Sequence, residues 1–266
     1  LICNRNDLPT TAAAKFSEPG DGYIKYLGLC SHEYFHTWNV KRIKPAAFAP
    51  YDLQAETYTP LLWLFEGFTS YYDDLLLLRS GLITEAAYLK LLGKSIGGVL
   101  RGSGRTKQSV ADSSFDAWSK YYRQDENAPN AIVSYYGKGS LIALAFDLTI
   151  RAKTEGRKSL DDIMLALWQR FGHDFYPTVG RGVTEAEVEA LFDEVSGLKL
   201  KPMFDRYVRG TEDLPLAKLY APFGVKLADE RKNARPSFDV SIGREGADCK
   251  LTQVHEDGAA HRAGLS

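Results

Sequence analysis

The chain has 266 residues, of which 44% are hydrophobic and 25% charged, and this composition excludes a chain that is disordered throughout. Its formal net charge of −1 excludes the strongly basic surface of a nucleic-acid-binding protein, so we expect no nucleic acid among its partners. No apolar run reaches about 18 residues, so we expect a soluble protein without a transmembrane segment. The choice between cytoplasm and periplasm stays open.

Helical periodicity and helix-capping residues dominate the first two hundred residues. The stretch 38–59 contains prolines and has no helical period, so we interpret it, with its basic residues Lys41, Arg42 and Lys44, as a solvated loop. The stretch 102–109 is interpreted as a plain surface loop, because it lacks the spacing of a phosphate-binding loop. The expected helices cover residues 24–36, 61–80, 84–92, 133–154, 159–171, 184–197 and 202–208.

After Gly210 the sequence changes from helical periodicity to the alternation that is typical of strands. The start of a further helix is expected at Gly258. The chain therefore divides into a helical domain, residues 1–215, and a β-rich domain, residues 216–266. Three strands do not close a sheet domain, and the chain does not begin with Met, so we expect a piece of a longer protein. The expected strands cover residues 223–227, 238–242 and 249–254.

The strongest functional signal is the motif His32-Glu33-Tyr34-Phe35-His36. On a helix, residues four apart lie one above the other, so both imidazoles face the same point and suit Zn²⁺. Glu33 lies about 100° around the helix from His32, so it flanks the metal and can take a proton from metal-bound water. The three cysteines form no C-x-x-C pair, so neither structural disulfides nor a cysteine-based zinc site is expected.

Two histidines leave a zinc site incomplete, because a catalytic zinc ion normally has three protein ligands. The best third candidate is Glu66, a carboxylate inside an apolar helical run where an unpaired charge would be costly. Its structural alternative is a buried ion pair with Arg or Lys. Asp73 lies two helical turns further along the same face and is a candidate acceptor for a hydrogen bond from a ligand imidazole. An exposed surface acid is the alternative for Asp73.

The motif His32-Glu33-x-x-His36 with Glu66 resembles the gluzincins, and its flanks point to a narrower family. The segment 31–45, followed by Leu62-Trp63-x-x-Glu66-Gly67-x-Thr69-x-Tyr71-Tyr72, is similar to the glycyl aminopeptidases, PDZ-containing metalloproteases that are relatives of aminopeptidase N. The resemblance covers essentially the whole chain. Further matching segments are residues 135–139, 159–162 and 206–215.

The resemblance implies a mainly α fold, in which a thermolysin-like, gluzincin-type helical catalytic domain is followed by a partial, β-rich PDZ domain. It implies a Zn²⁺ cofactor held by His32, His36 and Glu66, with Glu33 as the general base. It also implies a peptide as the substrate and a peptide or protein as the ligand of the PDZ domain.

The resemblance also implies a residue that stabilises the transition state. Tyr136 matches the family's Tyr-x-Lys-Gly motif, whose phenol donates to the oxyanion; from periodicity alone, Tyr135 is an equal candidate.

The sequence departs from the family's pattern in two places. No residue in the stretch 1–23 matches the family's Gly-Gly-x-Glu-like segment, which in related aminopeptidases grips the substrate amine. Asp239 stands where PDZ domains have an apolar loop that binds carboxylates, and its charge would repel a peptide's C-terminus.

We therefore expect a zinc-dependent peptidase, an aminopeptidase that releases small N-terminal residues such as Gly or Ala by attack of a metal-activated water. An endopeptidase with the same chemistry is one alternative, because the amine-gripping segment is not found. A non-catalytic scaffold that keeps a structural zinc and works through its PDZ domain is the other. Glu33 argues against the scaffold, because zinc binding alone does not need this residue. Without the amine anchor, we expect these 266 residues to bind zinc but to hydrolyse peptides poorly.

Overall fold

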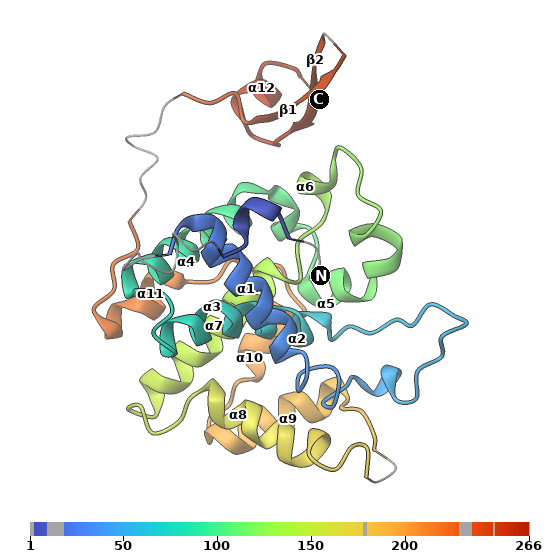
Figure 1. Ribbon diagram of the computed structural model, residues 1–266, viewed down its shortest axis with the longest axis vertical. Helices are drawn as coiled ribbons and strands as arrows, with labels where there is room; N and C mark the ends of the chain where they lie inside the picture. The colour runs from blue at the N-terminus through green and yellow to red at the C-terminus, as the bar shows by residue number, and fades with distance from the viewer. Residues whose placement is uncertain (1–2, 10–18, 178–179, 229–235, 247, 266) are drawn as a thin grey trace.

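The computed structural model describes residues 3–9, 19–177, 180–228, 236–246 and 248–265. Helices form most of the molecule, and a two-stranded hairpin lies at one end of it (Figure 1). In chain order the helices are α1 (Asp21–Phe35), α2 (Leu62–Phe65), α3 (Gly67–Arg79), α4 (Glu85–Arg101), α5 (Val110–Phe115), α6 (Ala128–Ala131), α7 (Gly137–Lys153), α8 (Leu160–Leu167), α9 (Glu185–Ser196), α10 (Lys201–Met203), α11 (Leu216–Tyr220) and α12 (Ala259–Arg262). The strands are β1 (Val240–Glu245) and β2 (Asp248–Val254).

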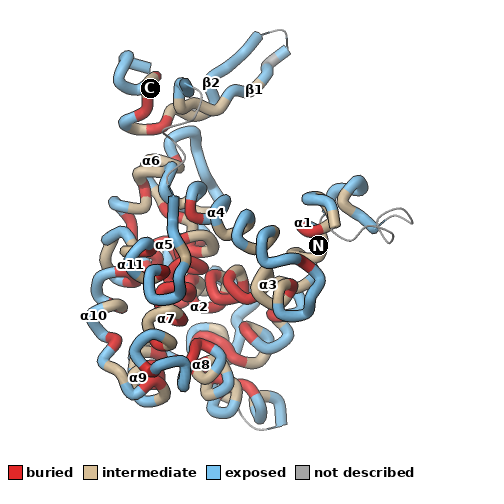
Figure 2. The backbone as a smooth tube through the Cα atoms, turned by 90° about the vertical axis from the view of Figure 1, so that its left-hand side faces the viewer, coloured by how far each residue is buried: buried red, intermediate tan, exposed pale blue. Residues whose placement is uncertain are grey.

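Helix α7 is the central helix of the molecule, and residues 138–147 are all buried (Figure 2). A helix that is buried on every side is expected to be apolar all round, and most of this stretch is. The charged exceptions have partners. Lys138 donates through Nζ to the carbonyl oxygen of Arg105 at 2.9 Å, and Asp147 accepts from the Tyr71 hydroxyl at 2.7 Å. The core therefore tolerates these charges because their polar atoms are hydrogen-bonded.

Helix α3 lies against both α1 and α7. At its first residue, Gly67, a side chain has no room, because a Cβ there would lie 2.6 Å from the Cα of Gly139 in α7 and 2.9 Å from the carbonyl oxygen of Tyr135. The first turns of α3 and α7 therefore meet backbone to backbone. Against α1, the ring of Tyr72 in α3 stacks on Phe35, with 5.0 Å between ring centroids.

The hairpin is attached to the helical part by polar contacts. β1 and β2 pair antiparallel, with Val240 opposite Val254 at one end. The side-chain amide of Asn130 in α6 donates to the carbonyl oxygen of Val254 and accepts from the backbone amide of Glu256, both at 2.8 Å. The Glu256 carboxylate in turn pairs with Lys107. Both of these links are made by polar groups, and neither buries an apolar side chain.

The chain is mainly helical, as the sequence predicted. The helices expected over 24–36, 159–171, 184–197 and 202–208 are confirmed to within a few residues, although 168–172 and 204–208 are wound as π-helices. The helix expected over 61–80 is interrupted at Glu66, and the one expected from residue 133 begins at Gly137. Helix α4 continues to Arg101, nine residues beyond the expected end.

The strand expected over 223–227 is wrong. Residues Ala221–Phe223 form a 3₁₀ turn that ends at Gly224, whose φ of 71° lies in the left-handed region where glycine is favoured. Helix α11, which precedes this turn, packs against α7 and buries Leu216 and Tyr220. The strands expected over 238–242 and 249–254 are confirmed with shifted ends as β1 and β2. The domain boundary after residue 215 and the PDZ identity of the hairpin stay predictions.

The two expected loops also differ from a plain solvated chain. Residues Ser103–Thr106 form a 3₁₀ turn. Lys44 is buried, with Nζ 4.5 Å from the ring centroid of Tyr51 and 4.9 Å from that of Phe175, so cation–π contacts replace the expected solvent. None of the helices in the described part of the chain is both long enough and apolar enough to cross a membrane.

The contact between α3 and α7 predicts opposite effects for two Gly→Ala substitutions. Gly67→Ala should lower the free energy of unfolding by about 1–3 kcal/mol, because the new methyl group meets backbone atoms that cannot move aside. Gly93→Ala, in the exposed middle of α4 with no atom within 4 Å, should raise it by roughly 0.5–1 kcal/mol. Urea unfolding of both variants measures these changes. A Gly67→Ala protein as stable as the wild type would contradict the close approach.

Candidate metal centre

Helix α1 positions two imidazoles side by side. His32 lies in the last turn of α1, and His36 follows as the residue that ends the helix. Their ring centroids are 4.7 Å apart and the rings stand edge to face. The side chains of His32 and His36 are 15% and 12% exposed, so both are largely screened from water but still reachable from it. The helical spacing of four residues therefore places both rings around one point, as the sequence predicted.

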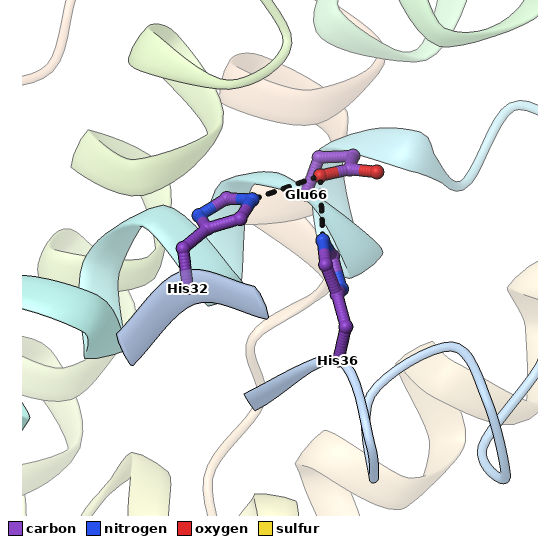
Figure 3. A group of neighbouring side chains, drawn as sticks. All are labelled: His32, His36 and Glu66. Carbon is purple, nitrogen blue, oxygen red and sulfur yellow. Dashed lines mark ion pairs between the residues drawn. The ribbon is translucent and has the colours of Figure 1, made fainter. Parts of the chain in front are cut away.

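Glu66 faces both imidazoles from the interruption between α2 and α3 (Figure 3). Its Oε2 lies 3.4 Å from Nε2 of His32 and 3.2 Å from Nε2 of His36. In a tetrahedral zinc site with bonds of about 2.0–2.1 Å, ligand atoms are separated by about 3.3 Å. Within the described residues these three side chains form a group able to hold a metal ion, with all ligand atoms within 4.8 Å of one another.

The charges of the three side chains are strongly coupled. Burial alone would raise the pKa of Glu66, but the two imidazoles outweigh it and lower the pKa to about 2. Burial alone would lower the pKa of His32, but its interactions with Asp73 and Glu66 raise it to about 9. Despite this attraction, Oε2 of Glu66 is buried and has no hydrogen-bond partner in the described part of the chain. A buried carboxylate oxygen without a hydrogen bond is costly, and a cation between the three side chains would remove this cost.

Each imidazole is oriented by an acceptor at its other nitrogen. Nδ1 of His32 lies 3.0 Å from Oδ2 of Asp73, and Nδ1 of His36 lies 2.9 Å from the backbone oxygen of Asn39. A carbonyl oxygen only accepts, so the proton of a neutral His36 is on Nδ1 and the lone pair of Nε2 faces Glu66. Asp73 thus lies where the sequence placed it, in contact with a candidate ligand. Its influence on a metal stays a prediction.

Of the two predicted catalytic residues, Glu33 is next to His32 in the sequence, and Tyr136 contacts the ring of His32. Glu33 is exposed, and it makes no hydrogen bond or ion pair with any residue that the structure describes. Tyr136 directly precedes α7, and its ring lies over His32, with 6.3 Å between centroids and 29° between planes. Burial and then the negative charge of Glu66 raise the pKa of the Tyr136 phenol, so it stays protonated at neutral pH and can donate. The roles of both residues stay predictions.

The structure separates Tyr135 from Tyr136, which the helical periodicity could not do. The ring of Tyr135 is buried, and its hydroxyl donates to the hydroxyl of Tyr122 at 3.3 Å. The Tyr122 hydroxyl also lies 3.1 Å from that of Tyr136. Tyr122 could not be predicted from the sequence, because no spacing rule links it to a residue 14 positions later.

Comparisons with known proteins agree with the sequence motifs. Residues 25–142 match the family model of the M61 glycyl aminopeptidases, which confirms the predicted resemblance. A crystal structure of an aminopeptidase N family protein from Idiomarina loihiensis is 40% identical to this chain and superposes on it with a TM-score of 0.89. The match covers 99% of this chain and 46% of that protein, so the chain spans less than half of its relative's length. A comparison with curated proteins finds no match.

The contact between Asp73 and His32 predicts that Asp73→Asn weakens zinc affinity by about 10–100-fold while the fold survives, because a carboxylate that orients a ligand imidazole also raises its basicity. Competition with a chelator at fixed pH measures the affinity. Asp74→Asn is the matched control, since it removes the neighbouring carboxylate, which contacts no candidate ligand in the described structure. Equal zinc affinities in the two variants would contradict a role of Asp73 in metal binding and favour the interpretation of Asp73 as a surface acid.

Proposed function

Because residues 25–142 match the family model of the M61 glycyl aminopeptidases, we propose that this protein is a zinc-dependent aminopeptidase that releases small N-terminal residues, glycine or alanine, from peptides. The observation that carries the proposal is the convergence of two imidazole nitrogens on a buried carboxylate oxygen that has no hydrogen bond within the described part of the chain. A glutamate next to one of the histidines and a neutral phenol over its ring complete the set of groups that peptide hydrolysis requires.

His32, His36 and Glu66 would hold the zinc ion, because imidazole and carboxylate are zinc ligands and three protein ligands leave a position open for chemistry. When bound, the ion would supply an acidified water and a Lewis acid for the substrate carbonyl. The protein prepares for this by holding both imidazoles with acceptors at Nδ1, so that both Nε2 atoms face the site.

Glu33 would serve as the general base. It lies next to His32 in sequence but on a different side of the helix, so its carboxylate flanks the ligand atoms. Because Glu33 has no ion pair with another residue of the described chain, the carboxylate is free to take a proton from the attacking water and to pass it to the leaving amine.

Tyr136 would stabilise the oxyanion. Its phenol is held in the protonated state by burial and by the negative charge of Glu66, so it is a neutral donor whose hydrogen bond strengthens as negative charge develops on the substrate oxygen. The hydroxyl of Tyr122 lies within hydrogen-bonding distance of that of Tyr136 and limits its directions.

The role of Glu33 is tested by Glu33→Gln in the full-length protein. The variant should keep one equivalent of zinc and lose about 10²–10⁴-fold in kcat, because the amide cannot take up the proton. Metal analysis and hydrolysis of a glycyl or alanyl amide measure the two quantities. Activity within tenfold of the wild type at full zinc occupancy would remove Glu33 from the role of general base.

The role of Tyr136 is tested by Tyr136→Phe. We expect kcat to fall by about 10²–10³-fold with little change in KM, because the lost hydrogen bond matters mainly in the transition state. Tyr135→Phe is the matched control, since it removes the neighbouring hydroxyl, which donates to Tyr122. A larger defect in Tyr135→Phe than in Tyr136→Phe would mean that the oxyanion is stabilised by the other phenol.

A further inference from the structure

Asn39 is a fully buried polar residue directly after the segment that holds His36. The residue is 0% exposed, although asparagine is mostly exposed in proteins. The contacts of Asn39 lead in two directions. One reaches the end of α1, and the other reaches the end of α2, so one residue joins the two elements from which the candidate metal ligands come.

The backbone of Asn39 fixes the end of α1. Its amide donates to the carbonyl oxygen of Phe35 at 3.1 Å, and its carbonyl oxygen accepts from Nδ1 of His36 at 2.9 Å. The next residue, Val40, has a φ of 124°, which is a strained conformation for a branched residue. Such a turn persists only where its surroundings hold it, and the two hydrogen bonds of Asn39 lie directly beside it in the chain.

The side chain of Asn39 holds the end of α2. Its Nδ2 donates to the carbonyl oxygens of Leu64 at 3.3 Å and Phe65 at 3.1 Å, and lies 3.4 Å from the hydroxyl of Thr69. Carbonyl groups in the last turn of a helix lack partners within the helix, and α2 ends at Phe65. The amide of Asn39 therefore supplies donors at the interruption from which Glu66 points into the site.

We propose that Asn39 is a positioning residue that sets the distance between His36 and Glu66. Its carbonyl orients the imidazole of His36, and its amide holds the backbone on which Glu66 stands. One contact is made by the backbone and the other by the side chain of the same buried residue, so a displacement of one candidate ligand is transmitted to the other. This inference rests on the proposed zinc-dependent function, because it concerns two of the three proposed ligands.

The test measures the zinc dissociation constant of the folded, metal-free protein by competition with a chelator. Asn39→Asp keeps the shape of the side chain but replaces the NH₂ donor with an oxygen that faces two carbonyl oxygens. We expect zinc binding about 10–100-fold weaker, as for the loss of other groups that orient ligands. A negative charge added near a cation would by itself strengthen binding, so weaker binding identifies lost positioning. Unchanged or tighter binding overturns the proposal.

Asn39→Ser provides the second variant if the aspartate does not fold. Its shorter side chain cannot span to Leu64 and Phe65, and it carries no charge, so we again expect zinc binding at least tenfold weaker. Asn130→Ala is the matched control. It also removes an amide that joins two backbone segments, but those segments are α6 and the end of β2. Its zinc affinity should stay within twofold of the wild type, and a drop equal to that of the Asn39 variants overturns the proposal.

A measurement on the wild-type protein covers the case in which neither Asn39 variant folds. In a ¹⁵N-labelled sample, zinc should shift the side-chain NH₂ signals of Asn39 and leave those of Asn130 in place. An unmoved Asn39 signal at full zinc occupancy overturns the proposal. Zinc binding by the wild-type protein is measured before any variant is compared. A wild-type protein that binds no zinc would contradict the proposed function itself, not the role of Asn39.

Discussion

The backbones of Gly67 and Gly139 meet so closely that neither residue can carry a side chain, and the arrangement of the site depends on this contact. Glu66 precedes Gly67 by one residue, and Tyr136 precedes Gly139 by three. The contact therefore brings the third candidate metal ligand and the candidate oxyanion donor to the same place from two different helices. Helix α1 completes the arrangement by packing against α3.

The polar groups of the site form an ordered series of partners. Asp73 contacts Nδ1 of His32, the two Nε2 atoms face Glu66, and Nδ1 of His36 contacts the carbonyl oxygen of Asn39. Each imidazole thus has a partner at both nitrogens, and of these partners only the carbonyl oxygen of Asn39 is close in sequence. The site is organised before a ligand arrives. The energetic cost of this preparation is the burial of Oε2 of Glu66, which lies near both imidazoles but has no hydrogen bond within the described residues.

The sequence was most informative where a functional pattern is local. The spacing of His32 and His36 follows from the helical period alone, and the cost of a lone carboxylate in an apolar run identified Glu66. The interruption of the helix at Glu66 was not predicted, because residues 61–80 contain no proline. The amide that donates to the carbonyl oxygen of Phe65 at this interruption belongs to Asn39, which comes from a turn far away in the sequence. Tyr122 was missed for the same reason, since its contacts are set by tertiary packing.

The strand expected at 223–227 failed because its short apolar alternation fits a turn equally well. The burial of Leu216 and Tyr220 against α7 fixed the preceding chain as a helix, and Pro222 with Gly224 then formed a tight turn. Lys44 shows a similar limit. A basic loop is usually solvated, and only the folded chain brings the rings of Tyr51 and Phe175 around its ammonium group.

The contact between Asp73 and His32 also decides the net charge of the site. A divalent cation there would meet one carboxylate among its ligands, Glu66, and a second behind an imidazole, Asp73. Its two positive charges and these two negative charges sum to zero. With three neutral imidazoles as ligands the same cation would keep its full charge and repel an ammonium group. If the protein acts as the proposed aminopeptidase, this neutrality would let the positively charged amino terminus of a peptide come close to the reacting bond.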